Sequence, residues 1–260
     1  MDSSTHKVYH VDKMHSRNHL DLYFSAKEDM DFGDDSLKFP MANLHYCLIS
    51  DHIRGDLAID ASLGSFIHHL CSVSKFFKEI AVLKCNEHCI MEVSKWLHNH
   101  TGAFDWKHAS SFIAGLEGKR DQHEDIEIRL KLSVKQVLKC DFEQEIIISP
   151  VVLPLVDCVV SCFLLDVISK NEEEYMKNME KLIKLLKPGG HLLLLSYINQ
   201  TYMTVGGIQF HVLKYDESFV KNTLNKLGLV IDYYAWQKRR NVNDLTNYTA
   251  VMFTAAHKGE

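Results

Sequence analysis

The chain has 260 residues, of which 46% are apolar and 24% are charged, and its formal net charge is -5. This balance is typical of a globular protein with a large core, which excludes disordered and fibrous classes, and the negative charge gives no electrostatic basis for nucleic-acid binding. One α/β domain with a sheet of about seven strands fills this length, so residues 1–260 are expected to form a single domain.

The apolar stretches and the cysteines bear on where the protein resides. The longest apolar stretches, residues 151–165 and 191–197, are interrupted well short of the ~20 residues that cross a bilayer. The first 17 residues are polar and lack the apolar segment of a secretory signal. Seven cysteines spread over apolar segments suit reduced thiols better than a disulfide framework. We therefore expect a cytoplasmic monomer that binds a small molecule and neither nucleic acid nor a membrane.

The first half of the chain alternates helical and strand patterns. Apolar residues between Leu37 and Leu48 recur at helical spacing and predict a helix over residues 36–49. The next elements in order are a strand over 57–61, a helix that begins after Gly64, a strand over 78–83, a helix over 90–97, a candidate short third strand over 110–114 and a long helix over 126–138.

The second half continues this alternation and then departs from it. It predicts a strand over 156–163, a helix over 175–186 closed by Lys-Pro-Gly-Gly, a strand over 192–197, a hairpin around 205–207, a helix over 216–227 and two strands over 230–237 and 248–255. Continuous apolar strands that alternate with helices indicate a parallel sheet covered on both faces. The last two strands are expected to pair antiparallel.

The first strand leads into the most informative stretch of the chain. Asp60 lies near the end of this strand, and a turn of small residues follows it. In α/β sheets a ligand binds at such a point, because the helix that begins there offers free N–H groups. The usual turn has the pattern Gly-x-Gly, but Ser62 occupies the first glycine position and only Gly64 is kept. The sequence therefore predicts a ligand site with altered chemistry.

Several longer blocks connect the chain to a known family. These blocks are Thr-Gly-Ala-Phe-Asp-Trp at 101–106, Leu-Glu-Gly at 116–118, Val-Lys-Gln-Val-Leu-Lys-Cys-Asp at 134–141, Leu-Pro-Leu-Val-Asp-Cys-Val at 153–159 and Leu-Leu-Lys-Pro-Gly-Gly-His-Leu at 185–192. They resemble the nicotinamide, indolethylamine and phenylethanolamine N-methyltransferases. The resemblance implies the Rossmann-like α/β fold of class I methyltransferases, with a seven-stranded, mostly parallel sheet whose last strands are antiparallel. It further implies lid helices in residues 1–50, a core over 56–260 and the cofactor S-adenosylmethionine (AdoMet).

The resemblance also implies which residues surround a former AdoMet pocket. Asp60 and Gly64 match the family at their positions. The other positions assigned to this pocket are mostly substituted, and they are His19, Phe24, Ser62, Leu63, Phe66, His68, Lys84, Cys89, Gly115, Leu116 and Cys162. On the substrate side Tyr23 and Tyr202 are kept, while Ser196 stands where the family has an acid.

The substitutions remove groups that AdoMet needs. Lys84 stands where the family has the acid that binds the ribose hydroxyls, and lysine has three donors and no acceptor. The side chain of Ser62 fills space beside the methionine part, and Gly115 has no side chain to accept from the adenine amino group. Loss of two charge-assisted hydrogen bonds, at ~1.5–3 kcal/mol each, weakens binding by roughly a hundredfold to ten-thousandfold.

Three functional hypotheses follow. The first is a catalytically weak or inactive paralogue that keeps the scaffold for binding or a structural role, with Asp60 serving only to cap a helix. The alternative is an active AdoMet-dependent methyltransferase (EC 2.1.1 type) of a small amine or pyridine. The third is a metal pocket built from the histidines and cysteines at the substituted positions, although Cys-x3-Cys at 85 and 89 is not the tight spacing of a zinc knuckle and we assign no metal ligand.

Overall fold

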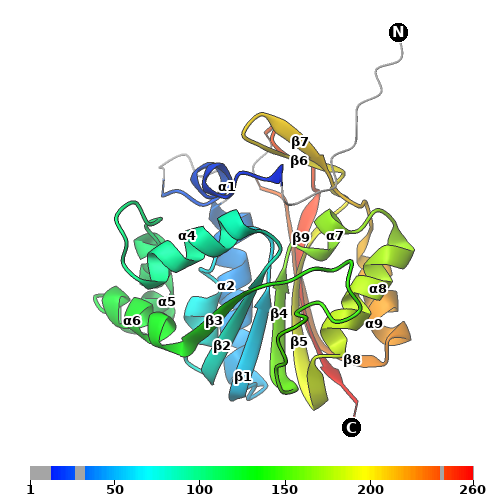
Figure 1. Ribbon diagram of the computed structural model, residues 1–260, viewed down its shortest axis with the longest axis horizontal. Coiled ribbons are helices and arrows are strands. Elements are labelled where there is room, and N and C mark those ends of the chain that lie inside the picture. Colours follow the sequence, from blue (N-terminus) through cyan, green and yellow to red (C-terminus); the bar gives the residue numbers. More distant parts are fainter. Residues whose placement is uncertain (1–12, 27–32, 241–242, 260) are drawn as a thin grey trace.

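The computed structural model describes residues 13–26, 33–240 and 243–259. Its centre is a seven-stranded sheet with the strand order β3-β2-β1-β4-β5-β9-β8 (Figure 1). The strands are β1 Gly55–Ala61, β2 Phe77–Lys84, β3 Val134–Lys139, β4 Val156–Cys162, β5 Leu186–Ile198, β8 Leu229–Lys238 and β9 Ala250–Lys258. Strands β1 to β5 are parallel, whereas β9 pairs antiparallel with both β5 and β8. The predicted fold class, including the antiparallel last strands, is confirmed.

Helices cover the central strands on both sides, which explains their continuous apolar sequences. Ala58 and Ile59 of β1 and Val159 and Val160 of β4 are fully buried. In Figure 1, α4 to α6 lie on one side of the sheet and α7 to α9 on the other. The helices are α2 Phe39–Ser50, α3 Leu70–Val73, α4 Glu87–Leu97, α5 Lys107–Leu116, α6 His123–Ser133, α7 Leu165–Ile168, α8 Glu172–Ile183 and α9 Glu217–Lys226. Within the described ranges, none of the helices is long and apolar enough to span a bilayer.

The N-terminal helix α1 (Ser16–Tyr23) and the hairpin β6 (Tyr202–Val205) and β7 (Ile208–His211) lie above the sheet in Figure 1. The Tyr23 hydroxyl joins them, because it donates to the carbonyl of Thr204 at 2.9 Å. The helix predicted over 36–49 consists of a π-helical segment η2 (Gly33–Lys38) and α2, and α2 packs against β8 and β9. Thus α1 and the hairpin cover the carboxyl ends of the parallel strands, where α/β sheets of this kind bind ligands.

The third strand was predicted wrongly. Residues 110–114 belong to α5, in which Ala109, Ser110, Ile113 and Ala114 are buried at helical spacing. The true third strand is β3, which the sequence pattern merged into a helix over 126–138. Helix α6 ends at Ser133, because the following residues pair in parallel with β2. This pairing with a distant strand outweighs the local helical pattern.

Two other boundaries also differ from the prediction. The backbone after Gly64 stays irregular until the short helix α3, so the first helix after β1 starts later than expected. The Lys-Pro-Gly-Gly segment at 187–190 lies inside β5, since α8 already ends at Ile183. The predicted hairpin near 205–207 is confirmed.

Candidate functional site

Asp60 at the end of β1 is the centre of a fully buried polar network. One carboxylate oxygen accepts from the Ser62 hydroxyl at 2.5 Å and contacts His69 Nε2 at 2.7 Å. The other oxygen accepts from Lys84 Nζ at 3.1 Å, and the ammonium also donates to the carbonyl of Ser62 at 3.2 Å. Lys84 is 1% exposed and Asp60 is 0% exposed. Asp60 therefore does not serve as a free helix cap, because its oxygens are already bound.

Opposing effects set the ionisation of Asp60. Burial raises its pKa, but the charge of Lys84, the neighbouring His69 and the hydrogen bond from Ser62 outweigh burial and hold the pKa below its usual range. The carboxylate is thus charged, and the buried ammonium balances it. This ion pair has little access to water, so it is worth more than an exposed pair and costs more to break.

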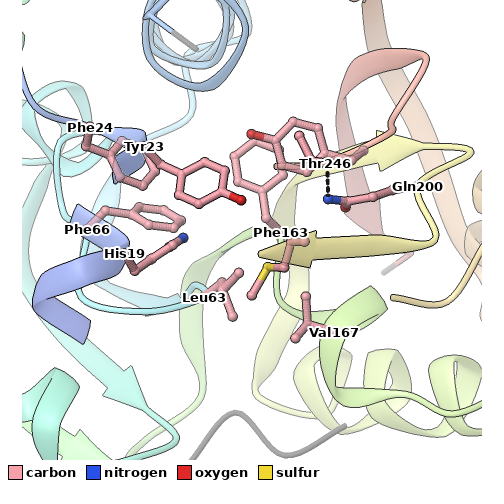
Figure 2. Close-up of a pocket in the computed structure, with 11 residues that line it drawn as sticks. His19, Tyr23, Phe24, Leu63, Phe66, Phe163, Val167, Gln200 and Thr246 are labelled. Carbon is pink, nitrogen blue, oxygen red and sulfur yellow. Dashed lines mark hydrogen bonds between the residues drawn. The ribbon is translucent and has the colours of Figure 1, made fainter. Parts of the chain in front are cut away.

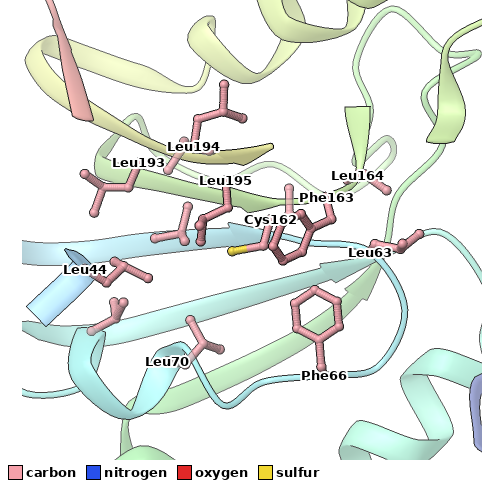
Figure 3. Close-up of a cluster of buried hydrophobic side chains, with 14 of the residues drawn as sticks. Leu44, Leu63, Phe66, Leu70, Cys162, Phe163, Leu164, Leu193, Leu194 and Leu195 are labelled. Carbon is pink, nitrogen blue, oxygen red and sulfur yellow. The ribbon is translucent and has the colours of Figure 1, made fainter. Parts of the chain in front are cut away.

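Ser62 adds a further constraint to the turn. Its hydroxyl accepts from the backbone N–H of Cys162 at 3.0 Å, at the end of β4. The N–H of Leu63 in turn donates to the Cys162 carbonyl at 2.9 Å. Cys162 itself lies in the buried apolar cluster with Leu63 and Phe66 (Figure 3). The position that carries glycine in the Gly-x-Gly pattern is therefore used here to tie β1 to β4.

His19 occupies the space above Gly64. Gly64 has a φ of +62°, and a Cβ built on it would lie 2.6 Å from His19 Nδ1. The imidazole is buried, and its Nδ1 has no hydrogen-bond partner among the described residues. Burial, and next the charge of Lys84, lower the pKa of His19 to about 3. A neutral ring thus fills the hollow that a glycine at this turn leaves open.

Aromatic rings complete the closure of this region. Phe24 lies 4.9 Å from Phe66 and 5.1 Å from His68, measured between ring centroids. His68 in turn lies 5.3 Å from Trp106, and its Nε2 is 3.2 Å from the Ser36 carbonyl. Burial keeps the pKa of His68 well below its ordinary value. The two substituted positions after Gly64 therefore belong to a packed aromatic cluster.

A small cavity remains beneath α1 (Figure 2). Its lining includes His19, Tyr23, Phe24, Leu63 and Phe66 from the predicted site, and the sequence analysis missed Phe163, Val167, Tyr197, Gln200, Met203 and Thr246. The volume of this cavity is about 20 Å³, which is enough for about one water molecule. Binding sites for drug-sized ligands measure roughly 300–1,000 Å³. A ligand of the size of AdoMet requires movement of His19, Phe24 or Phe66.

The remaining predicted residues lie outside the cavity. Tyr202 is half-buried on β6, and Ser196 is buried in β5 against Tyr175 and Tyr215. Cys89 is buried in the first turn of α4, where its N–H donates to the side chain of Asn86 at 2.8 Å. None of these three lines the cavity.

Gly115 and Leu116 of the predicted site lie on an exposed part of α5. A Cβ built on Gly115 meets no atom within 4 Å, and Leu116 is 43% exposed at the end of α5. The carboxyl end of the true third strand carries Asp141 instead, which is exposed. Its carboxylate accepts from the backbone N–H of Glu143 at 2.9 Å. This acid was missed because β3 was predicted as helix.

The histidines and cysteines of the suggested metal pocket lie in apolar surroundings. His19 and His68 pack among aromatic rings, and Cys89 and Cys162 are buried with raised pKa values caused by burial. In the described part of the chain, no group of three or more His, Cys, Asp or Glu side chains is arranged to hold a metal ion.

Comparison with known proteins identifies the family. The model of the NNMT/PNMT/TEMT family matches residues 3–259. Human nicotinamide N-methyltransferase is 30% identical over 254 residues, which cover 98% of this chain and 96% of the relative. The chain belongs to the NNMT/PNMT/TEMT family. Rabbit indolethylamine N-methyltransferase is 28% identical over 242 residues, which cover 93% of this chain and 92% of the relative.

Solved structures agree on the fold of this family member. The N-methyltransferase NodS from Bradyrhizobium japonicum, in complex with S-adenosyl-L-homocysteine, aligns with a TM-score of 0.55 at 13% identity, over 95% of this chain and 98% of NodS. Magnesium protoporphyrin IX methyltransferase from Synechocystis with bound AdoMet aligns with a TM-score of 0.57 at 11% identity, over 94% of this chain and 90% of that chain. Both therefore support a class I methyltransferase fold.

The charged groups of this family member do not fit AdoMet in the arrangement that the resemblance implies. The resemblance implies a ribose-binding carboxylate at position 84, but this position carries the ammonium of Lys84, which is bound to Asp60. His19 lies over Gly64 within the volume expected for the methionine part. Asp60 is buried at the end of β1, whereas Asp141, which follows β3, is exposed to solvent and accessible to a ligand.

Asp166, beside the cavity-lining Val167, is a buried acid that the sequence analysis missed. Burial raises its pKa to about 7, and one of its oxygens has no partner among the described residues.

Because the folded-state pKa lies above the unfolded value near 4, Asp166 favours folding below pH 4 and loses that contribution as the pH rises through 7. At pH 8 we expect the free energy of unfolding of Asp166→Asn to exceed that of the parent by on the order of 1–4 kcal/mol. At pH 5 we expect a smaller difference. Urea unfolding at both pH values measures this, and an equal difference at the two would contradict it.

Proposed function

We propose that this chain keeps the scaffold of the AdoMet-dependent small-molecule N-methyltransferases but is catalytically weak or inactive. The scaffold then serves ligand binding or a structural role. The single observation that carries this proposal is the buried ion pair between Lys84 and Asp60. It occupies the ends of β1 and β2, where the resemblance expects the cofactor.

The energetics of this pair support the proposal. Removing one partner of a buried pair costs about 3–5 kcal/mol, because the other charge is left uncompensated. AdoMet has to supply a comparable free energy to displace Lys84, and it also carries a positive sulfonium. A cost of this size lowers affinity by roughly a hundredfold to several thousandfold.

The alternative is an active N-methyltransferase of a small amine or pyridine. Membership of the family and the enzymatic names of the 28–30% identical relatives favour this alternative over lost activity. Tyr23, Tyr202 and the exposed acid Asp141 are features that it could use. It requires Lys84 and α1 to move when AdoMet binds. Transfer of the methyl group depends mainly on rigid in-line positioning, so such movement has to end in a well-ordered site.

We further propose the cytoplasmic location that the sequence analysis expected. All seven cysteines are free thiols, which fits a reducing compartment.

A methyl-transfer assay separates the proposal from its alternative. The purified full chain is incubated with methyl-labelled AdoMet and, in turn, nicotinamide, an indolethylamine and a phenylethanolamine. Human nicotinamide N-methyltransferase is the positive control. We expect labelled product to form at least roughly a hundredfold more slowly than with the human enzyme, or not at all, because the cofactor is held weakly. Turnover of any of the three acceptors at a rate comparable to that of the positive control contradicts the proposal and supports the active alternative.

A further inference from the structure

Two cysteines meet at the edge of the sheet beside the Asp60 network. Cys85 follows the last residue of β2, and Cys140 follows the last residue of β3. Lys84 and Lys139 are register partners, and the N–H of Cys140 donates to the Lys84 carbonyl at 3.0 Å. The two sulfur atoms lie 3.7 Å apart. Neighbouring strands are separated by about 4.8 Å, which falls within the range of Cα separations that a disulfide bridges.

The two thiols differ in access and in acidity. Cys85 is half-buried, whereas Cys140 is 2% exposed. The hydrogen bond with Cys140 and the charge of Lys84 lower the pKa of Cys85 despite its burial, and the same hydrogen bond raises the pKa of Cys140. Burial instead raises the pKa of the Cys71 and Cys89 thiols to about 12. A reachable, more acidic thiol next to a buried one is the arrangement of an attacking and a resolving cysteine.

We propose that Cys85 and Cys140 form a thiol–disulfide exchange site that reacts with low-molecular-weight disulfides such as oxidised glutathione. The Cys85 thiolate attacks one sulfur of glutathione disulfide, which forms a mixed disulfide and releases one glutathione thiolate. The Cys140 thiolate then attacks Sγ of Cys85, which forms the Cys85–Cys140 disulfide and releases the second glutathione. The two protein thiols lose two electrons and two protons, and the two glutathione molecules gain them.

This site does not depend on whether AdoMet binds. The sequence analysis considered Cys85 only together with Cys89, as part of a metal site, because the spacing along the chain is short. The partner Cys140 is 55 residues away, and only the parallel pairing of β2 with β3 brings it into contact.

The test uses the full chain at a series of ratios of oxidised to reduced glutathione, followed by alkylation and peptide mapping. Oxidation is expected to join the peptides that contain Cys85 and Cys140, to lower the mass by two hydrogen atoms and to leave no bound glutathione. In Cys140→Ser, the resolving thiol is missing, so a glutathione adduct is expected to persist on Cys85. In Cys85→Ser, neither the bridge nor an adduct at Cys140 is expected.

Cys158→Ser is the matched control, because Cys158 is buried in β4 and burial raises its pKa. This variant is expected to form the bridge as readily as the parent. The proposal is overturned if both Cys85 and Cys140 of the parent remain fully alkylated under oxidising conditions. It is also overturned if the parent keeps as much bound glutathione as Cys140→Ser. The first of these two readouts uses the parent chain alone, so it is independent of how well the variants fold.

Discussion

The Lys84→Met variant is expected to lose about 3–5 kcal/mol of its free energy of unfolding. Methionine keeps much of the length of the side chain but removes the ammonium that balances Asp60 across 3.1 Å. The buried carboxylate is then left with His69 and Ser62 as its partners. Urea unfolding at neutral pH, compared with the parent protein, measures the loss.

A surface lysine provides the control for this variant. Lys78 pairs with Asp56, but their side chains are 80% and 73% exposed. Lys78→Met is expected to change the free energy of unfolding far less than Lys84→Met does, because solvent screens an exposed pair. Combining Lys84→Met with Asp60→Asn removes both charges and is expected to recover part of the loss. A cost for Lys84→Met no larger than that for Lys78→Met would contradict a structural role of the buried pair.

Restoring the acceptor at the end of β2 and opening the turn should create AdoMet affinity. The triple variant Lys84→Asp, Ser62→Gly, His19→Ala supplies a carboxylate, removes the hydroxyl tie between β1 and β4, and vacates the space above Gly64. We expect its AdoMet affinity to exceed that of the parent by roughly a hundredfold or more, because two charge-assisted hydrogen bonds are regained. Calorimetric titration measures the change.

Gly115→Asp is the matched control for the restored variant. The sequence analysis assigned Gly115 to the adenine, but the structure places it on an open surface of α5, so its substitution is expected to leave affinity unchanged. A gain from Gly115→Asp alone, or no gain from a folded triple variant, would contradict the site geometry. Circular dichroism of each variant establishes that it is folded.

The sheet was largely predictable from sequence because its central strands are apolar on both faces. Ala58, Ile59, Val159 and Val160 are buried, and this leaves a strong signal in the sequence. The third strand was missed because α6 passes into β3 at Ser133 without a glycine or proline between them. Pairing with β2 decides the conformation there, and a local pattern does not contain that information.

The chemistry of single residues at the candidate site could be inferred from the sequence, but the contacts between them could not. The sequence indicated that Lys84 cannot accept from a ribose, yet it did not indicate that the ammonium turns toward Asp60. That contact depends on β1 and β2 being parallel neighbours, in which Asp60 lies opposite Val82. The cavity lining could not be predicted from the sequence either. Its residues Phe163, Gln200 and Thr246 come from three separate segments with no common sequence pattern.

Calorimetric titration of the unmodified chain with AdoMet tests the central claim most directly, because it measures binding apart from any choice of methyl acceptor. The closed arrangement of Lys84, Asp60 and His19 predicts no saturable binding up to ~1 mM. The restored triple variant serves as the positive control in the same titration. A dissociation constant below ~100 µM for the unmodified chain would contradict the account, because AdoMet would then bind despite the buried ion pair.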